Sequence, residues 1–116
     1  MARRGEGVVA RSARYEVGGM HEPAAGTPSP MSFEIDGRFV ALGGVLGSHH
    51  VAGCIAALCA MVDADAKGVT ELTISTPDNL LRNHATGRWQ LRKPLLKECH
   101  PALRRMERRF DSVDWV

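Results

Sequence analysis

Residues 49–78 read HHVAGCIAALCAMVDADAKGVTELTISTPD, and they are the most informative part of the sequence about the fold. Its first part is apolar on nearly every side of a helix running from His49 to Lys67, which predicts a helix buried among other elements. Gly68 ends this helix, and the β-branched run 71–75 predicts a short strand. A helix that joins an earlier strand to this one forms a crossover, so we expect a pair of parallel strands.

The chain before this stretch predicts antiparallel strands. Residues 8–17 have enough β-branched and aromatic side chains for a strand, whereas Pro, Gly and Ala dominate residues 20–30 and predict a loop. Residues 32–35 and 38–46 flank Asp36-Gly37, a pair that favours the positive φ angles of a tight turn. This arrangement predicts a β-hairpin.

The chain after this stretch predicts two helices and a final strand. Residues 76–78 (Thr-Pro-Asp) suit the N-cap and first turn of a short helix. A second, amphipathic helix begins near Pro94, and Pro101 is expected to kink it. Residues 112–116 predict a last strand.

The composition is that of one globular domain. Of the 116 residues, 44% are hydrophobic and 24% are charged, which excludes a multidomain enzyme, a disordered chain and a coiled coil. The sequence contains no run of about 20 apolar residues, and charges occupy the N-terminal segment where a signal peptide needs its apolar core. We therefore expect a cytoplasmic protein with no membrane partner.

The three cysteines are Cys54, Cys59 and Cys99. Their spacing is not that of a zinc site, their number is odd, and two of them lie inside the apolar helix. We therefore expect buried free thiols, and metal or redox roles are the less favoured alternatives.

Positive charge is concentrated in two parts of the chain. The net charge is only +2, but residues 82–109 contain nine Lys or Arg and two Glu, a local excess of +7. The first 14 residues add four Arg and one Glu. This distribution predicts a basic N-terminal arm over residues 1–13 and one domain over residues 14–116.

Four short segments carry a family resemblance. Residues 49–53 (His-His-Val-Ala-Gly) are similar to a helix start that reads Asn-Asn-x-Ala-Glu, and residues 74–78 are similar to a strand end that reads Thr-Asp-Ser. Residues 87–89 (Gly-Arg-Trp) and 113–116 are similar to a Gly-x-Trp segment and a final strand. All four of these patterns are found in ribonuclease H, type 1, which the sequence therefore resembles. The resemblance implies an α/β fold whose mixed five-stranded sheet has strands 1–3 antiparallel, strands 4 and 5 parallel, and helices mainly on one face.

The same resemblance implies a catalytic site in which four carboxylates hold two Mg²⁺ or Mn²⁺ ions. The first position corresponds to Val17 or Gly18, the second to Gly53 and the third to Pro77, while the fourth lies beyond the last residue. None of these residues has a side-chain atom that can bind a hard cation. We therefore expect no catalytic residues, no bound metal and no cofactor.

Glu16, Asp36 and Asp78 are candidates for a displaced set of carboxylates. Glu16 is one residue from the expected position, and such an offset in a strand reverses the direction of the side chain. Asp78 also suits the positive end of a helix as a purely structural acid. Mg²⁺ or Mn²⁺ is expected only if these acids form a site.

Several residues are candidate contacts with nucleic acid. In the family, the residues that match His49 and His50 contact the minor groove, although capping or simple exposure also explains both histidines, and a metal pair lacks a third ligand. The basic segment around Trp89 corresponds to the family's duplex-binding region, and core anchoring is the alternative role of this Trp. The candidates are His49, His50, Asn79, Arg88, Trp89, Arg92 and Lys93.

Taken together, these features predict a catalytically inactive ribonuclease H-like domain that binds an RNA/DNA hybrid or duplex, or that acts in assembly. One alternative is a metal-dependent ribonuclease H that cleaves the RNA of RNA/DNA hybrids through displaced or dimer-shared carboxylates. The other is a purely structural protein-interaction domain. Because no residues remain for the family's last helix, we also expect an uncovered apolar sheet face and a homodimer that covers it.

Overall fold

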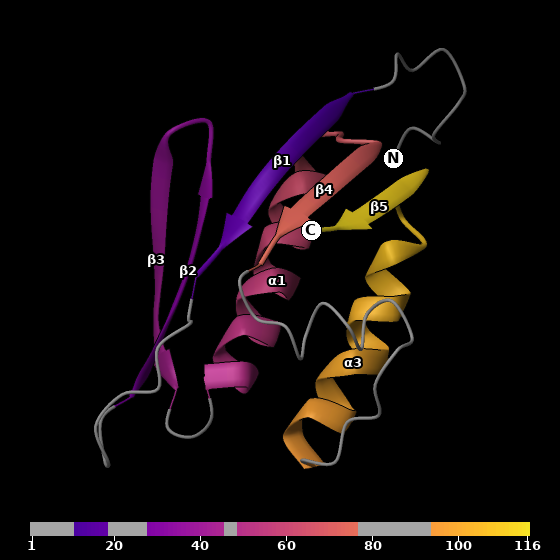
Figure 1. The fold of residues 1–116 in the computed structure, drawn as a ribbon. Helices are drawn as coiled ribbons and strands as arrows, with labels where there is room; N and C mark the ends of the chain where they lie inside the picture. The colour runs from indigo at the N-terminus through magenta and orange to yellow at the C-terminus, as the bar shows by residue number, and fades with distance from the viewer. Residues whose placement is uncertain (1–10, 19–27, 46–48, 77–93) are drawn as a thin grey trace.

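The structure, a computed structural model, describes residues 11–18, 28–45, 49–76 and 94–116 (Figure 1). Ser12 and Ala13, which the sequence places in the N-terminal arm, belong to the first strand. The elements in chain order are β1 (Ser12–Val17), β2 (Ser29–Ile35), β3 (Arg38–Val45), α1 (His49–Ala66), β4 (Glu71–Ser75), α3 (Pro94–Glu107) and β5 (Ser112–Trp115).

The described strands form one mixed sheet in the order β3-β2-β1-β4-β5. β1 pairs antiparallel with β2, and β2 pairs antiparallel with β3. β4 lies parallel to β1, and β5 lies parallel to β4. α1 and α3 pack against each other and share one hydrophobic core with the sheet (Figure 1). The expected α/β fold, with its antiparallel and parallel parts, is confirmed.

The hairpin between β2 and β3 turns at Asp36 and Gly37, as expected. Their φ angles are 51° and 76°, a region that Asp and Gly adopt more easily than other residues. The expected extent of the loop before the hairpin, residues 20–30, is wrong at its end, because β2 already begins at Ser29. Pro30 is tolerated in the strand beside a pairing irregularity, where its partner in β3 is Gly44.

The helix α1 confirms the expected buried helix, with one correction. Ala52, Ala56, Ala60 and Ala64 recur at intervals of four and are 0% exposed. This spacing places them on one side of the helix, and their small side chains allow a close approach to neighbouring elements. The helix is not buried all round, because Val62 is 56% exposed. Apolar character alone does not tell which side of a helix has neighbours.

Tyr15 connects β1 to the last turns of α1. Its hydroxyl donates a 2.6 Å hydrogen bond to Asp63, which also pairs with Lys67 at 2.8 Å. Burial and this hydrogen bond raise the pKa of Tyr15. Burial acts to raise the pKa of Asp63 as well, but the hydrogen bonds from Lys67 and Tyr15 outweigh it and hold that pKa below its usual value. A protonated Tyr15 and an ionised Asp63 therefore fix the strand against the helix.

The starts of the helix α3 and of the strand β5 agree with the predictions, and the kink expected at Pro101 stays a prediction. α3 begins at Pro94 and contains Pro101, and Leu103 on its inner side is 1% exposed. Phe110 follows the helix rather than lying within it, and its ring still reaches the core. Neither helix of the described ranges is long and apolar enough to cross a membrane.

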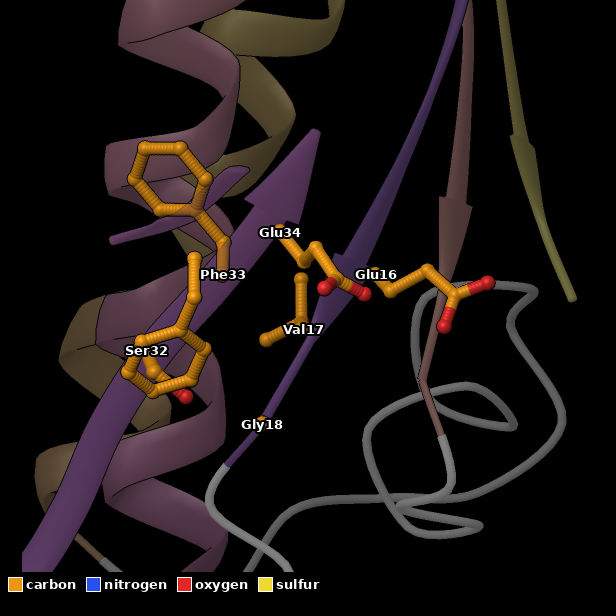
Figure 2. A pocket seen from close by; sticks show the side chains of 7 residues that line it. Glu16, Val17, Gly18, Ser32, Phe33 and Glu34 are labelled. Carbon is orange, nitrogen blue, oxygen red and sulfur yellow. The ribbon is translucent and has the colours of Figure 1, made fainter. Parts of the chain in front are cut away.

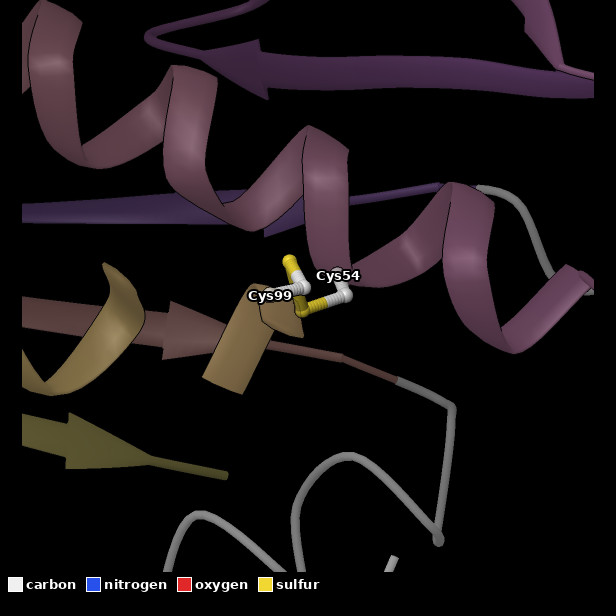
Figure 3. Close-up of a disulfide and its surroundings, with 2 residues drawn as sticks. All are labelled: Cys54 and Cys99. Atoms are coloured by element: carbon white, nitrogen blue, oxygen red, sulfur yellow. A yellow bond between two sulfur atoms is a disulfide. The ribbon is translucent and has the colours of Figure 1, made fainter. Parts of the chain in front are cut away.

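The cysteines differ from the expected free thiols. Cys54 of α1 and Cys99 of α3 form a disulfide between positions separated by 45 residues (Figure 3). Cys59 is free and half-buried, and burial raises the pKa of its thiol. The expectation was wrong for Cys54 and Cys99 because their pairing depends on which sides of the two helices meet, and sequence spacing does not supply this.

The sheet face opposite the helices is polar rather than apolar. Its described strands carry Arg14 and four carboxylates, those of Glu16, Glu34, Glu71 and Asp114. A sheet with antiparallel strands commonly keeps one face in water, and this alternation of polar and apolar residues is its signature. The expectation of an uncovered apolar face was therefore wrong for these strands, and the homodimer that rests on it stays a prediction.

Tyr15→Phe tests the link between β1 and α1. We expect this variant to lower the free energy of unfolding at neutral pH by about 1–2 kcal/mol, because Asp63 loses a buried donor. Tyr15 is the only tyrosine in the sequence, and its pKa is higher in the folded than in the unfolded state. The unfolding free energy of the wild type should therefore decrease above about pH 10, as the tyrosine of the unfolded state ionises. Tyr15→Phe has no such group, so this contribution to the alkaline decrease should be absent from it.

Urea denaturation of both proteins from neutral to alkaline pH measures the two effects. Equal stability of the two proteins at neutral pH, or an identical alkaline loss in both, would show that the hydroxyl does not hold β1 to α1.

Candidate functional site

The candidate site lies where the parallel strands β1 and β4 end. Glu16 of β1 is opposite Ser75 of β4, so the two strands end side by side. α1 precedes β4 and runs in the opposite direction, so its first turns lie toward the same edge of the sheet (Figure 1). In α/β sheets the carboxyl ends of parallel strands commonly carry the functional side chains. The residues at these three ends therefore decide which chemistry the edge can support.

The residue at the first expected carboxylate position, Val17, is part of the hydrophobic core. Val17 is 3% exposed, and it shares the hydrophobic core with Phe33. The N–H of Gly18 donates a 2.9 Å hydrogen bond to the carbonyl of Ser32. A Cβ at Gly18 would collide with the Ser32 hydroxyl. An acid at position 17 would thus be buried among apolar groups, and one at position 18 would require Ser32 to move.

The second position, Gly53, is buried within α1. The next residue, Cys54, is 1% exposed, and its disulfide joins this turn of the helix to α3. Thr76 is buried at the end of β4, and its N–H donates a 2.9 Å hydrogen bond to the carbonyl of Val116. The third position, Pro77, lies outside the described residues. On the side of the sheet that faces α1, the described part of this edge therefore carries no acid.

Glu16 lies near the lost position in sequence but on the other side of the sheet. Figure 2 shows its side chain and that of Val17 extending to different sides of β1, as alternation in a strand requires. The Glu16 side chain is 60% exposed and lies 3.7 Å from the guanidinium of Arg14. Glu34 is its neighbour in β2. Glu16 is thus directed away from α1 and from Gly53.

On this open side, a hollow of about 210 Å³ lies beside Glu16 and Glu34. Gly18, Ser32 and Phe39 also line the hollow, together with the core residues Val17 and Phe33. Two carboxylates and one hydroxyl do not make the compact oxygen cage that two divalent cations require. The hollow therefore offers no replacement for the expected metal site.

The other displaced candidates do not complete a site either. Asp36 lies at the tip of the hairpin, exposed, and β2 runs antiparallel to β1, so this tip points toward the start of β1 and not toward its end. Asp78 lies outside the described residues. Within the described ranges, no three His, Cys, Asp or Glu side chains are grouped so that they could hold a metal ion.

The four arginines at the C-terminal end of α3 and just after it differ in whether they form ion pairs. Arg104 contacts Glu107 at 3.3 Å, and Arg109 contacts Asp65 of α1 at 2.6 Å. Arg105 and Arg108 are exposed, and no ion pair joins either of them to another described residue. Two of the four arginines at this end of the helix therefore stabilise the fold, and the other two present their charge to solvent.

Most of the expected nucleic-acid contacts cannot be placed. His49 and His50 begin α1, and their side chains are not described. The remaining candidates, Asn79, Arg88, Trp89, Arg92 and Lys93, lie outside the described residues. The roles of the seven candidates therefore stay predictions.

Two features of the described structure were not expected from the sequence. The hydrogen bond between Tyr15 and Asp63 was not anticipated, although a tyrosine in β1 and an acid late in an apolar helix were visible signals. The disulfide between Cys54 and Cys99 had a weaker signal, because each cysteine lies on an apolar helix side that could face the other. Both features bind α1 to its neighbours.

The comparisons with known proteins show the fold. No protein-family model and no curated protein matches the chain. Among solved structures, the N-terminal RNase H domain of Rv2228c from Mycobacterium tuberculosis, a fusion with maltose-binding protein, gives a TM-score of 0.70 at 18% identity. The match covers 90% of this chain and 84% of that chain.

Two further solved structures agree. RNase H1 from the halophilic archaeon Halobacterium salinarum gives a TM-score of 0.73 at 19% identity, over 90% of this chain and 83% of that chain. LC11-RNase H1, solved in complex with an RNA/DNA hybrid, gives 0.65 at 17% identity, over 90% of this chain and 82% of that chain. The chain therefore has the ribonuclease H fold.

Val17→Asp tests whether this edge can still accept a metal-binding acid. We expect the variant to lose about 3 kcal/mol of unfolding free energy at neutral pH, because a carboxylate would be buried in the core without a partner. The loss should be smaller at acidic pH, where the carboxyl group is neutral. Millimolar Mn²⁺ should not restore the stability, since Gly53 supplies no second acid.

Thermal and urea unfolding with and without Mn²⁺ measure this effect, and Val17→Asn is the uncharged control of similar shape. A rise in melting temperature of several degrees with Mn²⁺ for Val17→Asp alone would show that nearby ligands complete a metal site after all.

Proposed function

We propose that this domain binds nucleic acid, with an RNA/DNA hybrid or duplex as its ligand, and does not hydrolyse it. The main observation against hydrolysis is that Val17, at the first carboxylate position, is buried in the core at 3% exposure. Gly53, buried in α1, supports it at the second position. Hydrolysis by two metal ions needs carboxylates that hold both cations, and neither residue can coordinate a hard cation.

Positive charge supports the nucleic-acid part of the proposal. Arg105 and Arg108 of α3 are exposed, and the chain enters this helix from the segment that contains Arg88, Arg92 and Lys93. Phosphate contacts need only positive charge and hydrogen-bond donors, so they do not depend on a working catalytic site. LC11-RNase H1, which has the same fold, was solved with an RNA/DNA hybrid, and this favours the same class of ligand here.

The distribution of charge favours binding through the α3 side. The open sheet face carries four carboxylates and one arginine in its described strands. Negative potential over that face repels phosphate, whereas the exposed arginines of α3 attract it. A hydrolytic role would instead require acids outside the described residues, because Glu16 and Asp36 lie away from the site.

An assembly role is the second candidate. Phe39 in the edge strand β3 is 68% exposed on the open face, and exposed aromatic side chains are common in protein interfaces. A homodimer through this face would have to pair mainly polar side chains. Light scattering at micromolar concentration distinguishes a dimer from a protein of 12.6 kDa.

Replacement of Arg88, Arg92 and Lys93 by Gln tests the proposed binding. We expect the wild type to bind a labelled RNA/DNA hybrid with an affinity that falls as salt rises, because each phosphate contact releases counterions. The triple variant should weaken binding and reduce the slope of log K against log salt by about one unit for each lost contact.

Arg14→Gln is the matched control for each single substitution, because Arg14 is exposed on the acidic face beside Glu16. It removes the same charge, so it should leave the slope unchanged. If Arg14→Gln and Arg88→Gln reduce the slope equally, the effect comes from net charge and the proposed surface is wrong.

A further inference from the structure

The open face of the sheet carries an exposed phenylalanine beside two carboxylates. Glu16 of β1 is directly opposite Glu34 of β2, and Glu34 is directly opposite Phe39 of β3. Figure 2 shows the two glutamates on their neighbouring strands. Residues directly opposite each other point to the same face, so the three side chains form one row about 10 Å long across three strands. Phe39 is 68% exposed at the end of this row.

The negative charge of this row is not balanced within the described structure. Like charges directly opposite each other on neighbouring strands destabilise a sheet, and Glu16 and Glu34 are such a pair. Arg14 lies 3.7 Å from Glu16, but both side chains are 60% exposed, and a solvated pair of this kind contributes little. No ion pair joins Glu34 to another described residue. A cation from outside the chain would therefore relieve the repulsion.

The hollow of about 210 Å³ beside this row limits the size of what can enter it. Pockets for drug-sized molecules are larger, at about 300–1,000 Å³. Gly18 and Ser32 are the next pair along β1 and β2, and they line the hollow beside the two glutamates. A Cβ at Gly18 would meet the Ser32 hydroxyl, so glycine keeps this space open. The hollow therefore suits one side chain of a partner rather than a whole small molecule.

An arginine side chain matches the row better than other cations do. Its guanidinium group is planar, presents five donors that can bind carboxylates, and stacks on aromatic rings through its flat face. A lysine ammonium is a compact and strongly hydrated charge without such a face. A divalent cation requires more oxygen ligands than two carboxylates and one hydroxyl supply. A guanidinium uses both glutamates and the ring of Phe39 together.

We propose that the row of Glu16, Glu34 and Phe39 is a docking site for an arginine in a basic segment of a partner protein. The guanidinium binds the two carboxylates and stacks on the phenylalanine ring. Further basic residues of the segment lie over the rest of the open face, whose described strands carry four carboxylates and only one arginine. The site does not depend on the proposed nucleic-acid binding, because the open face and α3 lie on opposite sides of the sheet (Figure 1).

A second copy of this chain is the less favoured occupant. Its exposed arginines, Arg105 and Arg108, belong to α3, on the side of the sheet opposite the open face. A contact between α3 of one copy and the open face of another joins two unlike surfaces. Such contacts give rings or open chains rather than a closed dimer. A basic segment of a different protein meets no such constraint.

Binding of a labelled peptide of alternating Arg and Ser to the full chain, measured by fluorescence anisotropy without nucleic acid, tests the docking site. A peptide with Lys in place of Arg is the matched probe. Glu34→Gln removes one carboxylate of the row, and Phe39→Leu keeps an apolar side chain but removes the ring. Glu71→Gln is the matched control, because Glu71 is opposite Ser12, four residues before Glu16 in β1. Its glutamine can still accept the hydrogen bond from the Ser12 hydroxyl.

We expect the wild type to bind the Arg peptide several times more tightly than the Lys peptide, with an affinity that falls as salt rises. Glu34→Gln should raise the Kd for the Arg peptide about fivefold, and Phe39→Leu about threefold. Glu71→Gln should stay close to the wild type. Arg14→Gln should lower the Kd, because it removes the cation that competes for Glu16.

Four results would overturn the docking site. No binding of the Arg peptide at low salt would exclude it, and an equal rise in Kd for Glu34→Gln and Glu71→Gln would show a response to net charge alone. Equal affinity for the two peptides, or an unchanged Kd in Phe39→Leu, would exclude the recognition of arginine. Light scattering that shows assemblies of the wild type, which Glu34→Gln dissociates, would place a second copy on this face instead. All the substituted side chains are exposed, and circular dichroism verifies that each variant is folded.

Discussion

The packing of α1 against the sheet is the constraint on which the rest of this structure depends. Four alanines at intervals of four residues, from Ala52 to Ala64, are fully buried and let the helix approach its neighbours closely. The hydrogen bond from Tyr15 to Asp63 holds the C-terminal end of the helix to β1, and the disulfide from Cys54 to Cys99 holds its beginning to α3. Both ends of α1 are therefore attached by specific bonds in addition to apolar contacts.

The same packing explains why the end of β1 has no carboxylate. Side chains on this face of the strand, such as Tyr15 and Val17, are buried against the helix, so an acid there would be desolvated unless metal ions compensated its charge. Gly53 removes the side chain at the matching turn of α1. Acids occur instead on the opposite, solvated face, where Glu16 and Glu34 stay hydrated. The fold is thus preserved while the described part of the edge has the character of a hydrophobic core.

Much of the fold could be predicted because local signals agreed with one another. The apolar helix from His49, the Asp36-Gly37 turn and the strand before Thr76 each appear close to their expected bounds. The loss of carboxylates could also be read from the sequence, because it concerns residue identity. The disulfide could not, since it depends on which sides of α1 and α3 meet in space. The polar open face was missed, although the alternation of polar and apolar residues in β1 indicates it. For Glu16, the alternation of side chains along a strand indicates that it lies on the face opposite Val17, and Figure 2 shows this arrangement.

The most direct test of this account is incubation of the purified protein with a uniformly labelled RNA/DNA hybrid and Mn²⁺ at low salt, followed by separation of bound, free and cleaved RNA. We expect a retained complex and intact RNA at every Mn²⁺ concentration, because the described edge of the sheet offers no ligands for two cations. Any cleavage that depends on Mn²⁺ would overturn this conclusion. Its persistence in a Glu16→Gln variant would show that acids outside the described residues form a working metal site.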